Sequence, residues 1–125
     1  MVAYSFNKRF VDPIVAGRKT QTIRGNGKRR HARVGEALQL YFGMRTKQCM
    51  KIIADPICEL SVPITISVRP KGIKAIWAGG EPVADLETFA RSDGFADLAD
   101  MFAYWLDNFG AGDFQGTLIG WSHRS

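Results

Sequence analysis

The chain has 125 residues, of which 46% are hydrophobic and 23% charged, and its formal net charge at pH 7 is +5. This composition is close to that of globular domains and excludes the class of disordered proteins, which combine low hydrophobicity with high net charge. The length corresponds to one domain, so we expect residues 1–125 to fold as a single unit. No apolar run approaches the ~20 residues that cross a bilayer, and the sequence predicts no membrane partner.

Charge is distributed unevenly along the sequence. Residues 18–51 contain ten Lys or Arg and one acid, Glu36, whereas residues 81–113 contain eight Asp or Glu and one Arg. A concentrated positive charge favours an acidic partner such as a nucleic acid.

The cysteines and histidines show no spacing typical of a metal site. Cys49 and Cys58 lie in an apolar stretch, and His31 and His123 are far from them and from each other. The sequence therefore predicts no metal and no other cofactor, and it predicts that both cysteines are buried free thiols. The first residues lack the apolar core of a signal peptide, so we expect a reducing, cytoplasmic setting.

The predicted elements start with a strand over residues 2–6, VAYSF. A short helix follows over residues 12–17, DPIVAG. Asp12 is its expected N-cap and Pro13 its first residue, and Gly17 is expected just past its end.

The middle of the chain has sequence patterns typical of strands. Residues 19–24, KTQTIR, have the Thr and Ile content of a short strand, and residues 36–42, EALQLYF, alternate between two faces. Strand-like sequence continues over residues 48–62, 64–68 and 72–78. These segments follow one another without intervening helical patterns, which argues against a parallel βαβ fold.

The last third is predicted to be helical before it returns to a strand. Val83, Leu86 and Phe89 or Ala90 fall on one helical face, and apolar residues follow at alternating three- and four-residue steps from Phe95 to Phe109. This pattern predicts a strongly amphipathic helix that ends at Gly110 or Gly112. Its aromatic residues are interpreted as core. Residues 114–122 then predict a closing strand. The order of elements predicts a mixed α+β domain in which a curved or closed sheet carries one helical flank.

The most unusual segment is AGRKTQTIRGNGKRRHAR, residues 16–33, which holds seven Lys or Arg and no acid. Its loop either contacts the phosphates of a nucleic acid or nucleotide or is only a solvated, solubilising face. The candidate phosphate contacts in this loop are Lys28, Arg29, Arg30 and Arg33.

The strand within this segment offers a second candidate site. Strand alternation places Thr20, Thr22 and Arg24 on one face, where an arginine beside two hydroxyls can bind an anion. The other interpretation is an edge strand protected by charge. Lys19 precedes these residues and is either solvated or, in a pocket, able to lose its proton and act as a base.

Four stretches of the chain, FVDPIVAGRKTQTIR, HARVGEALQLYFGMRT, SDGF and FQGTLIGW, together resemble the ASCH family. This family consists of small domains related to the PUA-type RNA-binding barrel. The resemblance covers residues 6–122 and is weakest between residues 60 and 81. It implies a PUA-like mixed β-barrel flanked by helices, with a cleft that accepts nucleotides or RNA.

The resemblance also implies candidate catalytic residues. Some bacterial members of the family are amidohydrolases that remove the acyl group from N(4)-acetylcytidine with a lysine, a threonine and a glutamate. Lys19 and Thr22 match the first two, and Asp93 in SDGF stands where the glutamate is expected, one methylene shorter. Strict alternation places Lys19 and Thr22 on opposite faces, so they can meet only if Lys19 precedes the regular strand or the strand is bulged.

Three further residues are candidates for the site. Asp93 is either catalytic or the N-cap of the amphipathic helix. Tyr41 either supplies a stacking ring to a bound base or belongs to the core, and Arg45 is interpreted as a phosphate contact for that base. The sequence thus predicts a small RNA- or nucleoside-binding domain, with an amidohydrolase or a ribonuclease as the alternatives. Its expected cleft is lined by Lys19, Thr20, Thr22, Arg24 and Asp93.

Overall fold

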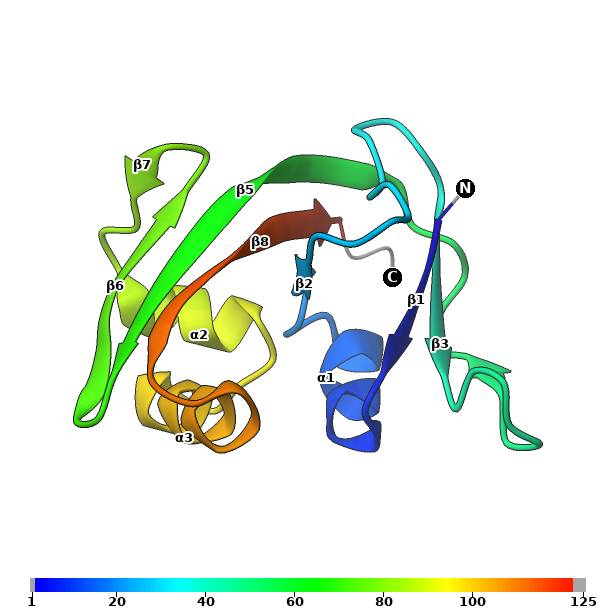
Figure 1. Cartoon of the computed structure of the whole chain (residues 1–125). Coiled ribbons are helices and arrows are strands. Elements are labelled where there is room, and N and C mark those ends of the chain that lie inside the picture. Colours follow the sequence, from blue (N-terminus) through cyan, green and yellow to red (C-terminus); the bar gives the residue numbers. More distant parts are fainter. Residues whose placement is uncertain (1, 123–125) are drawn as a thin grey trace.

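The computed structural model describes residues 2–122, whose strands form two sheets packed with three α-helices (Figure 1). The elements are β1 (Val2–Phe6), the 3-10 helix η1 (Lys8–Phe10), α1 (Val11–Ala16), β2 (Gln21–Gly25), β3 (Leu38–Phe42), β4 (Met50–Lys51), β5 (Cys58–Arg69), β6 (Gly72–Ala78), β7 (Glu81–Pro82), α2 (Leu86–Ser92), α3 (Leu98–Phe109) and β8 (Gly112–Trp121). The predicted α+β class is therefore confirmed. None of the helices in residues 2–122 has the length and apolar character needed to cross a membrane.

The larger sheet has five antiparallel strands in the order β2-β8-β5-β6-β7. Its long strands β5 and β8 curve over the helices as an arch (Figure 1). The smaller sheet has the order β1-β3-β4, with β1 and β3 parallel. Within residues 2–122 the two sheets do not join into the closed barrel that the family resemblance implied.

The gap between the two sheets lies between β1 and β2. A side chain crosses it where a closed barrel would have a ladder of backbone hydrogen bonds: Nη2 of Arg24 on β2 donates to the carbonyl oxygen of Ser5 on β1 at 2.7 Å. The open seam leaves room for side chains from both sheets and from α3 to surround a cavity.

The helical region differs from the predicted single helix. It consists of α2 and α3, each with its own N-cap: Asp85 accepts a hydrogen bond from the backbone N–H of Thr88, and Asp97 from that of Asp100. Asp93 is the C-cap of α2, so its interpretation as the N-cap of the amphipathic helix is wrong. The predicted end at Gly110 is correct.

Two local predictions near the N-terminus have different outcomes. Gly17 ends α1 in the left-handed conformation with φ of 80°, as predicted. Asp12 is not the N-cap, because the helix already begins at Val11 and the cap position is held by Phe10, which makes no side-chain capping bond.

The core lies between the arch and the helices. Alternation in β3 is confirmed, since Leu38 and Leu40 are fully buried and Gln39 is half-buried. The thiol prediction is correct for Cys58, which is buried, and wrong for Cys49, which is exposed in the irregular segment before β4.

Candidate functional site

A cavity of about 300 Å³ opens at the seam between β1 and β2, against α3. One part of its wall is polar and contains Lys19, Thr22, Arg24 and Asp93. The rest is largely aromatic, with rings from η1, α3 and β8 that include Phe10, Tyr104, Trp105, Phe109 and Phe114. The structure thus brings together all three predicted catalytic residues and one predicted binding residue.

Lys19 is a buried cation, with only 3% of the residue exposed. Its Nζ donates a 2.6 Å hydrogen bond to the carbonyl oxygen of Asp93 and lies 3.7 Å from Oδ1 of the same residue. Nζ also lies 4.7 Å from the ring centroid of Phe10. Burial nevertheless dominates and lowers the pKa of Lys19 to about 8, with Asp93 opposing the shift. A part of the Lys19 population is therefore a neutral amine near physiological pH.

The turn after α1 determines where Lys19 points. The backbone N–H groups of Arg18 and Lys19 both donate to the carbonyl oxygen of Pro13, at 2.9 and 3.0 Å. The regular strand β2 begins only at Gln21, so Lys19 lies before it. This is one of the two arrangements that allow Lys19 and Thr22 to line the same cavity despite strand alternation.

Asp93 reaches the cavity from the loop that follows α2. It is 5% exposed, and its Oδ1 accepts a hydrogen bond from Nε2 of Gln21 at 3.4 Å. Burial raises the pKa of Asp93, while the positive charge of Lys19 opposes that change. Gln21 was not among the predicted site residues, because its contact with Asp93 joins two segments that are distant in sequence.

Thr22 and Arg24 share one face of β2, as predicted. Nε of Arg24 donates to Oγ1 of Thr22 at 3.0 Å, and the guanidinium carbon lies 4.8 Å from the ring centroid of Phe6. The bond to Ser5 occupies Nη2, and Nη1 has no hydrogen-bond partner within residues 2–122. Arg24 thus holds the Thr22 hydroxyl and keeps donor capacity for a ligand.

Three predicted binding residues lie outside the cavity. Thr20 is half-buried and joins its neighbours through its backbone, which pairs with Ser92 and Trp121. Tyr41 belongs to β3 in the smaller sheet and lies under Nζ of Lys51 at 5.9 Å. Arg45 is exposed in the loop between β3 and β4, with φ of 69°. Thr20 therefore does not line the cavity, contrary to the prediction. Tyr41 does not line it either, so it cannot stack on a base held there.

The basic loop also lies outside the cavity, and its four cations are exposed: Lys28, Arg29, Arg30 and Arg33. His31 is engaged in this loop, whereas His123 lies outside the described residues. In the described part of the chain, no three His, Cys, Asp or Glu side chains gather where they could hold a metal ion.

The sequence did not indicate the aromatic part of the cavity. Phe95, Trp105 and Phe109 were interpreted as core, yet all three also line the cavity, and 59% of Phe109 is exposed. Apolar residues at helical spacing give the same sequence pattern whether they pack into the core or line a cavity, so periodicity cannot separate the two cases.

Gly94 is a positioning residue that the sequence also did not reveal. Its φ is +97°, and a Cβ atom built on it would lie 2.8 Å from Cδ of Lys19 and 3.1 Å from Cδ1 of Phe10. The Lys19 side chain cannot swing away without losing the bond between Nζ and Asp93. Gly94 therefore permits the close approach of the two segments that carry Lys19 and Asp93.

We expect Gly94→Ala to destabilise the protein through both backbone strain and overlap. The left-handed conformation costs about 1–2 kcal/mol in any L-residue, and forcing a methyl group into packed atoms adds about 1–3 kcal/mol. Gly80→Ala is the matched control, because Gly80 also has a positive φ, +82°, but has nothing within 4 Å of an added Cβ. Urea denaturation measures the free energy of unfolding of both variants. Equal losses of that free energy would contradict the close packing of Gly94 against Lys19.

The arrangement of side chains is suited to activating a hydroxyl group. A neutral Lys19 amine can accept a proton, Thr22 presents a hydroxyl, and the Arg24 cation bonded to that hydroxyl can stabilise negative charge on oxygen. Comparisons with protein-family models, with curated proteins and with solved structures found no match to this chain. Function is therefore inferred from the chemistry of the cavity together with the motif resemblance.

Proposed function

We propose that this protein is an ASCH-type domain that binds a modified nucleoside in the cavity and hydrolyses an acyl amide on its base, with N(4)-acetylcytidine as the test substrate. The observation that carries the proposal is the burial of Lys19 beside Asp93 in a cavity that also presents Thr22. In this proposal the fold is a PUA-like variant whose barrel stays open between β1 and β2.

The proposed reaction has two balanced steps. Neutral Lys19 takes the hydroxyl proton of Thr22 while Oγ1 bonds to the acyl carbon, and Arg24 stabilises the oxyanion that forms. The bond between the acyl carbon and the cytosine nitrogen then breaks, and the nitrogen leaves with the proton from Lys19. In the second step water attacks the acyl-threonine ester, which releases acetate and restores the Thr22 hydroxyl.

The size and lining of the cavity support a nucleoside as the ligand. A volume of about 300 Å³ is at the lower end of small-molecule sites and suits one compact ligand. The exposed ring of Phe109 offers a face on which a planar base can stack. The polar side chains lie at the other part of the wall, where an acyl carbonyl would need hydrogen-bond donors.

The pH dependence of turnover tests the role of Lys19. Because the base must be deprotonated and the pKa of Lys19 is lowered to about 8, kcat/KM should rise about tenfold per pH unit below pH 8 and level off above it. Release of cytidine from N(4)-acetylcytidine, followed by chromatography between pH 6 and pH 10, measures this profile. Absence of turnover, or a rate that does not change over this range, would contradict the proposal.

Binding without hydrolysis is the second candidate function. One observation favours it: the carbonyl oxygen and Oδ1 of Asp93 lie 2.6 and 3.7 Å from Nζ of Lys19, and both oxygens stabilise the ammonium form, which cannot accept a proton. Calorimetric titration with N(4)-acetylcytidine and with cytidine separates the two functions. Affinity for both with no product formed identifies a binding module.

A further inference from the structure

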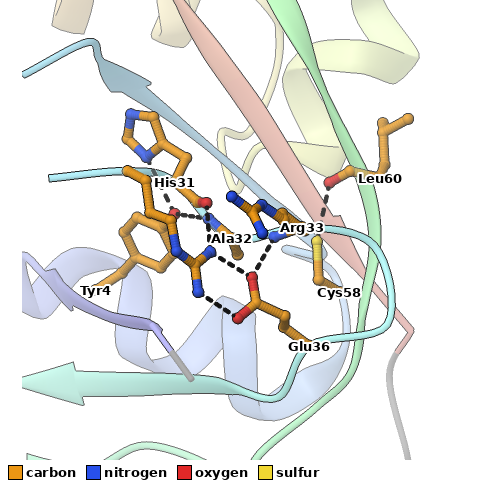
Figure 2. Close-up of polar contacts among 8 residues, drawn as sticks. Tyr4, His31, Ala32, Arg33, Glu36, Cys58 and Leu60 are labelled. Carbon is orange, nitrogen blue, oxygen red and sulfur yellow. Dashed lines mark hydrogen bonds and ion pairs between the residues drawn. The ribbon is translucent and has the colours of Figure 1, made fainter.

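The structure describes all three tyrosines of the chain, and only Tyr104 on α3 lines the cavity. The hydroxyl of Tyr4 is engaged outside the cavity: it accepts from the backbone N–H of Ala32 and makes a hydrogen bond with Nδ1 of His31, both at 3.1 Å (Figure 2). Tyr41 belongs to β3 in the smaller sheet. Tyr104 is therefore the one tyrosine whose hydroxyl a ligand in the cavity can reach.

The ring of Tyr104 is held by three neighbours. Its centroid lies 5.7 Å from that of Phe10 and 5.3 Å from that of Phe95. The guanidinium carbon of Arg9 lies 5.6 Å from the same centroid, and Arg9 is itself fixed by a 2.7 Å ion pair with Asp100, which also belongs to α3. A ring packed in this way keeps its hydroxyl in position before a ligand binds.

The hydroxyl of Tyr104 is unpaired and lies near the polar part of the cavity wall. It has no hydrogen-bond partner within residues 2–122, although the residue is half-buried. Burial lowers the pKa of Arg24, and Tyr104 is among the groups that oppose this shift electrostatically. The hydroxyl is therefore within electrostatic reach of the guanidinium that holds Thr22. Because half-buried hydroxyls usually find a partner, this one is available to a ligand.

The pyrimidine ring of an acylated cytidine offers that partner. When the acyl carbonyl faces Thr22 and Arg24, the ring extends toward the aromatic part of the wall, which contains Tyr104. The edge of the ring next to N4 carries N3 and O2, and both accept hydrogen bonds. When the bond between the acyl carbon and N4 breaks, the electron pair left on N4 is delocalised over N3 and O2. A hydroxyl that donates to this edge stabilises the developing charge.

We infer that Tyr104 is a further catalytic residue of the cavity, whose hydroxyl donates to the N3–O2 edge of the pyrimidine and stabilises the leaving base. This role rests on the proposed function. Tyr104 transfers no proton, so the balance of the two steps is unchanged and the proton from Lys19 still goes to N4. Because the hydrogen bond strengthens as charge develops on the ring, it raises kcat more than it lowers KM.

Tyr104→Phe tests the inference, because it keeps the ring against Phe10 and Phe95 and removes only the hydroxyl. Release of cytidine from N(4)-acetylcytidine, followed by chromatography, should show kcat lowered by about 10- to 100-fold, the size expected for a hydrogen bond to a charged group. Tyr41→Phe is the matched control, because it removes a tyrosine hydroxyl outside the cavity. Its turnover should equal that of the wild type.

Phenyl acetate provides a second substrate that separates a catalytic role from a structural one. It also acylates Thr22, but its leaving phenolate has no ring nitrogen and no ring carbonyl for Tyr104 to contact. Tyr104→Phe should therefore release phenol at the wild-type rate. An unchanged kcat for N(4)-acetylcytidine in this variant, or an equal loss on both substrates, would overturn the role of Tyr104.

The failure of the inference and the failure of the proposed function are distinguishable. If the wild type does not hydrolyse N(4)-acetylcytidine, the proposed function fails, and calorimetric titration with cytidine decides the contact of Tyr104 with the ring. Weaker cytidine binding by Tyr104→Phe than by Tyr41→Phe would support that contact. Equal affinities in the two variants, or no binding of cytidine by the wild type, would overturn it.

Discussion

Replacing Lys19 with methionine should lower kcat/KM for N(4)-acetylcytidine by about 10²- to 10⁴-fold, the contribution typical of a general base. Methionine keeps an unbranched apolar chain against Phe10 but removes the amine that takes the Thr22 proton. The assay is steady-state release of cytidine at pH 9 or above, where wild-type Lys19, with a pKa lowered to about 8, is largely neutral.

The control for this variant is Lys74→Met, which removes the charge of an exposed lysine on β6. It should keep wild-type turnover. Circular dichroism of the Lys19→Met variant shows whether the fold survives the loss of the partner of Asp93. A folded Lys19→Met variant with turnover within a few-fold of the wild type would refute the role of Lys19 as base.

The second large effect is expected for Gly116→Ala, on stability. A Cβ atom at Gly116 would overlap the backbone carbonyl oxygen of Arg24 and lie 2.9 Å from the ring of Phe114. Backbone atoms cannot rotate away, so β2 and β8 must separate where Gly25 and Gly116 pair. We expect a loss of about 1–3 kcal/mol or more in the free energy of unfolding, measured by urea denaturation.

Gly120→Ala provides the comparison on the same strand. Gly120 also pairs with β2, but an added Cβ would meet Cβ of Leu60 at 3.2 Å, a contact that a backbone shift of a few tenths of an ångström relieves. Its loss should be clearly smaller than that of Gly116→Ala. Similar losses of unfolding free energy at both positions would show that Gly116 is not needed for the close approach of β2 and β8 at Arg24.

The sequence predicted those strands and helix ends that depend only on residues close together in the chain. The strand at β1, the end of α1 at Gly17 and the end of α3 at Gly110 all follow from alternation or from the left-handed preference of glycine. The division between α2 and α3 was missed because the apolar residues of 83–90 and of 95–109 were assigned to the same helical face, across a step of five residues from Ala90 to Phe95. Asp97 and its acceptor role at the start of α3 were the available signal for the break.

The sheet arrangement and much of the cavity depend on contacts between distant segments. Alternation in β3 says which side chains are buried, but not that β3 pairs in parallel with β1, which takes Tyr41 away from the cavity. Lys19 and Asp93 were predicted together only through the motif resemblance, since 74 residues separate them. The roles of Gln21 and Gly94 depend on that same contact between distant segments, and no pattern of neighbouring residues indicates them.

Arg24 has a mechanical role as well as a chemical one. The same guanidinium that holds the Thr22 hydroxyl also spans the seam between the two sheets through Ser5. Any substitution of Arg24 therefore removes both the contact between the two sheets and the hydrogen bond to Thr22. Lost turnover in such a variant would not by itself identify a catalytic contribution of Arg24. By the same reasoning, a ligand that draws the guanidinium toward itself would loosen the joint between the sheets, which couples occupancy of the cavity to the rigidity of the whole domain.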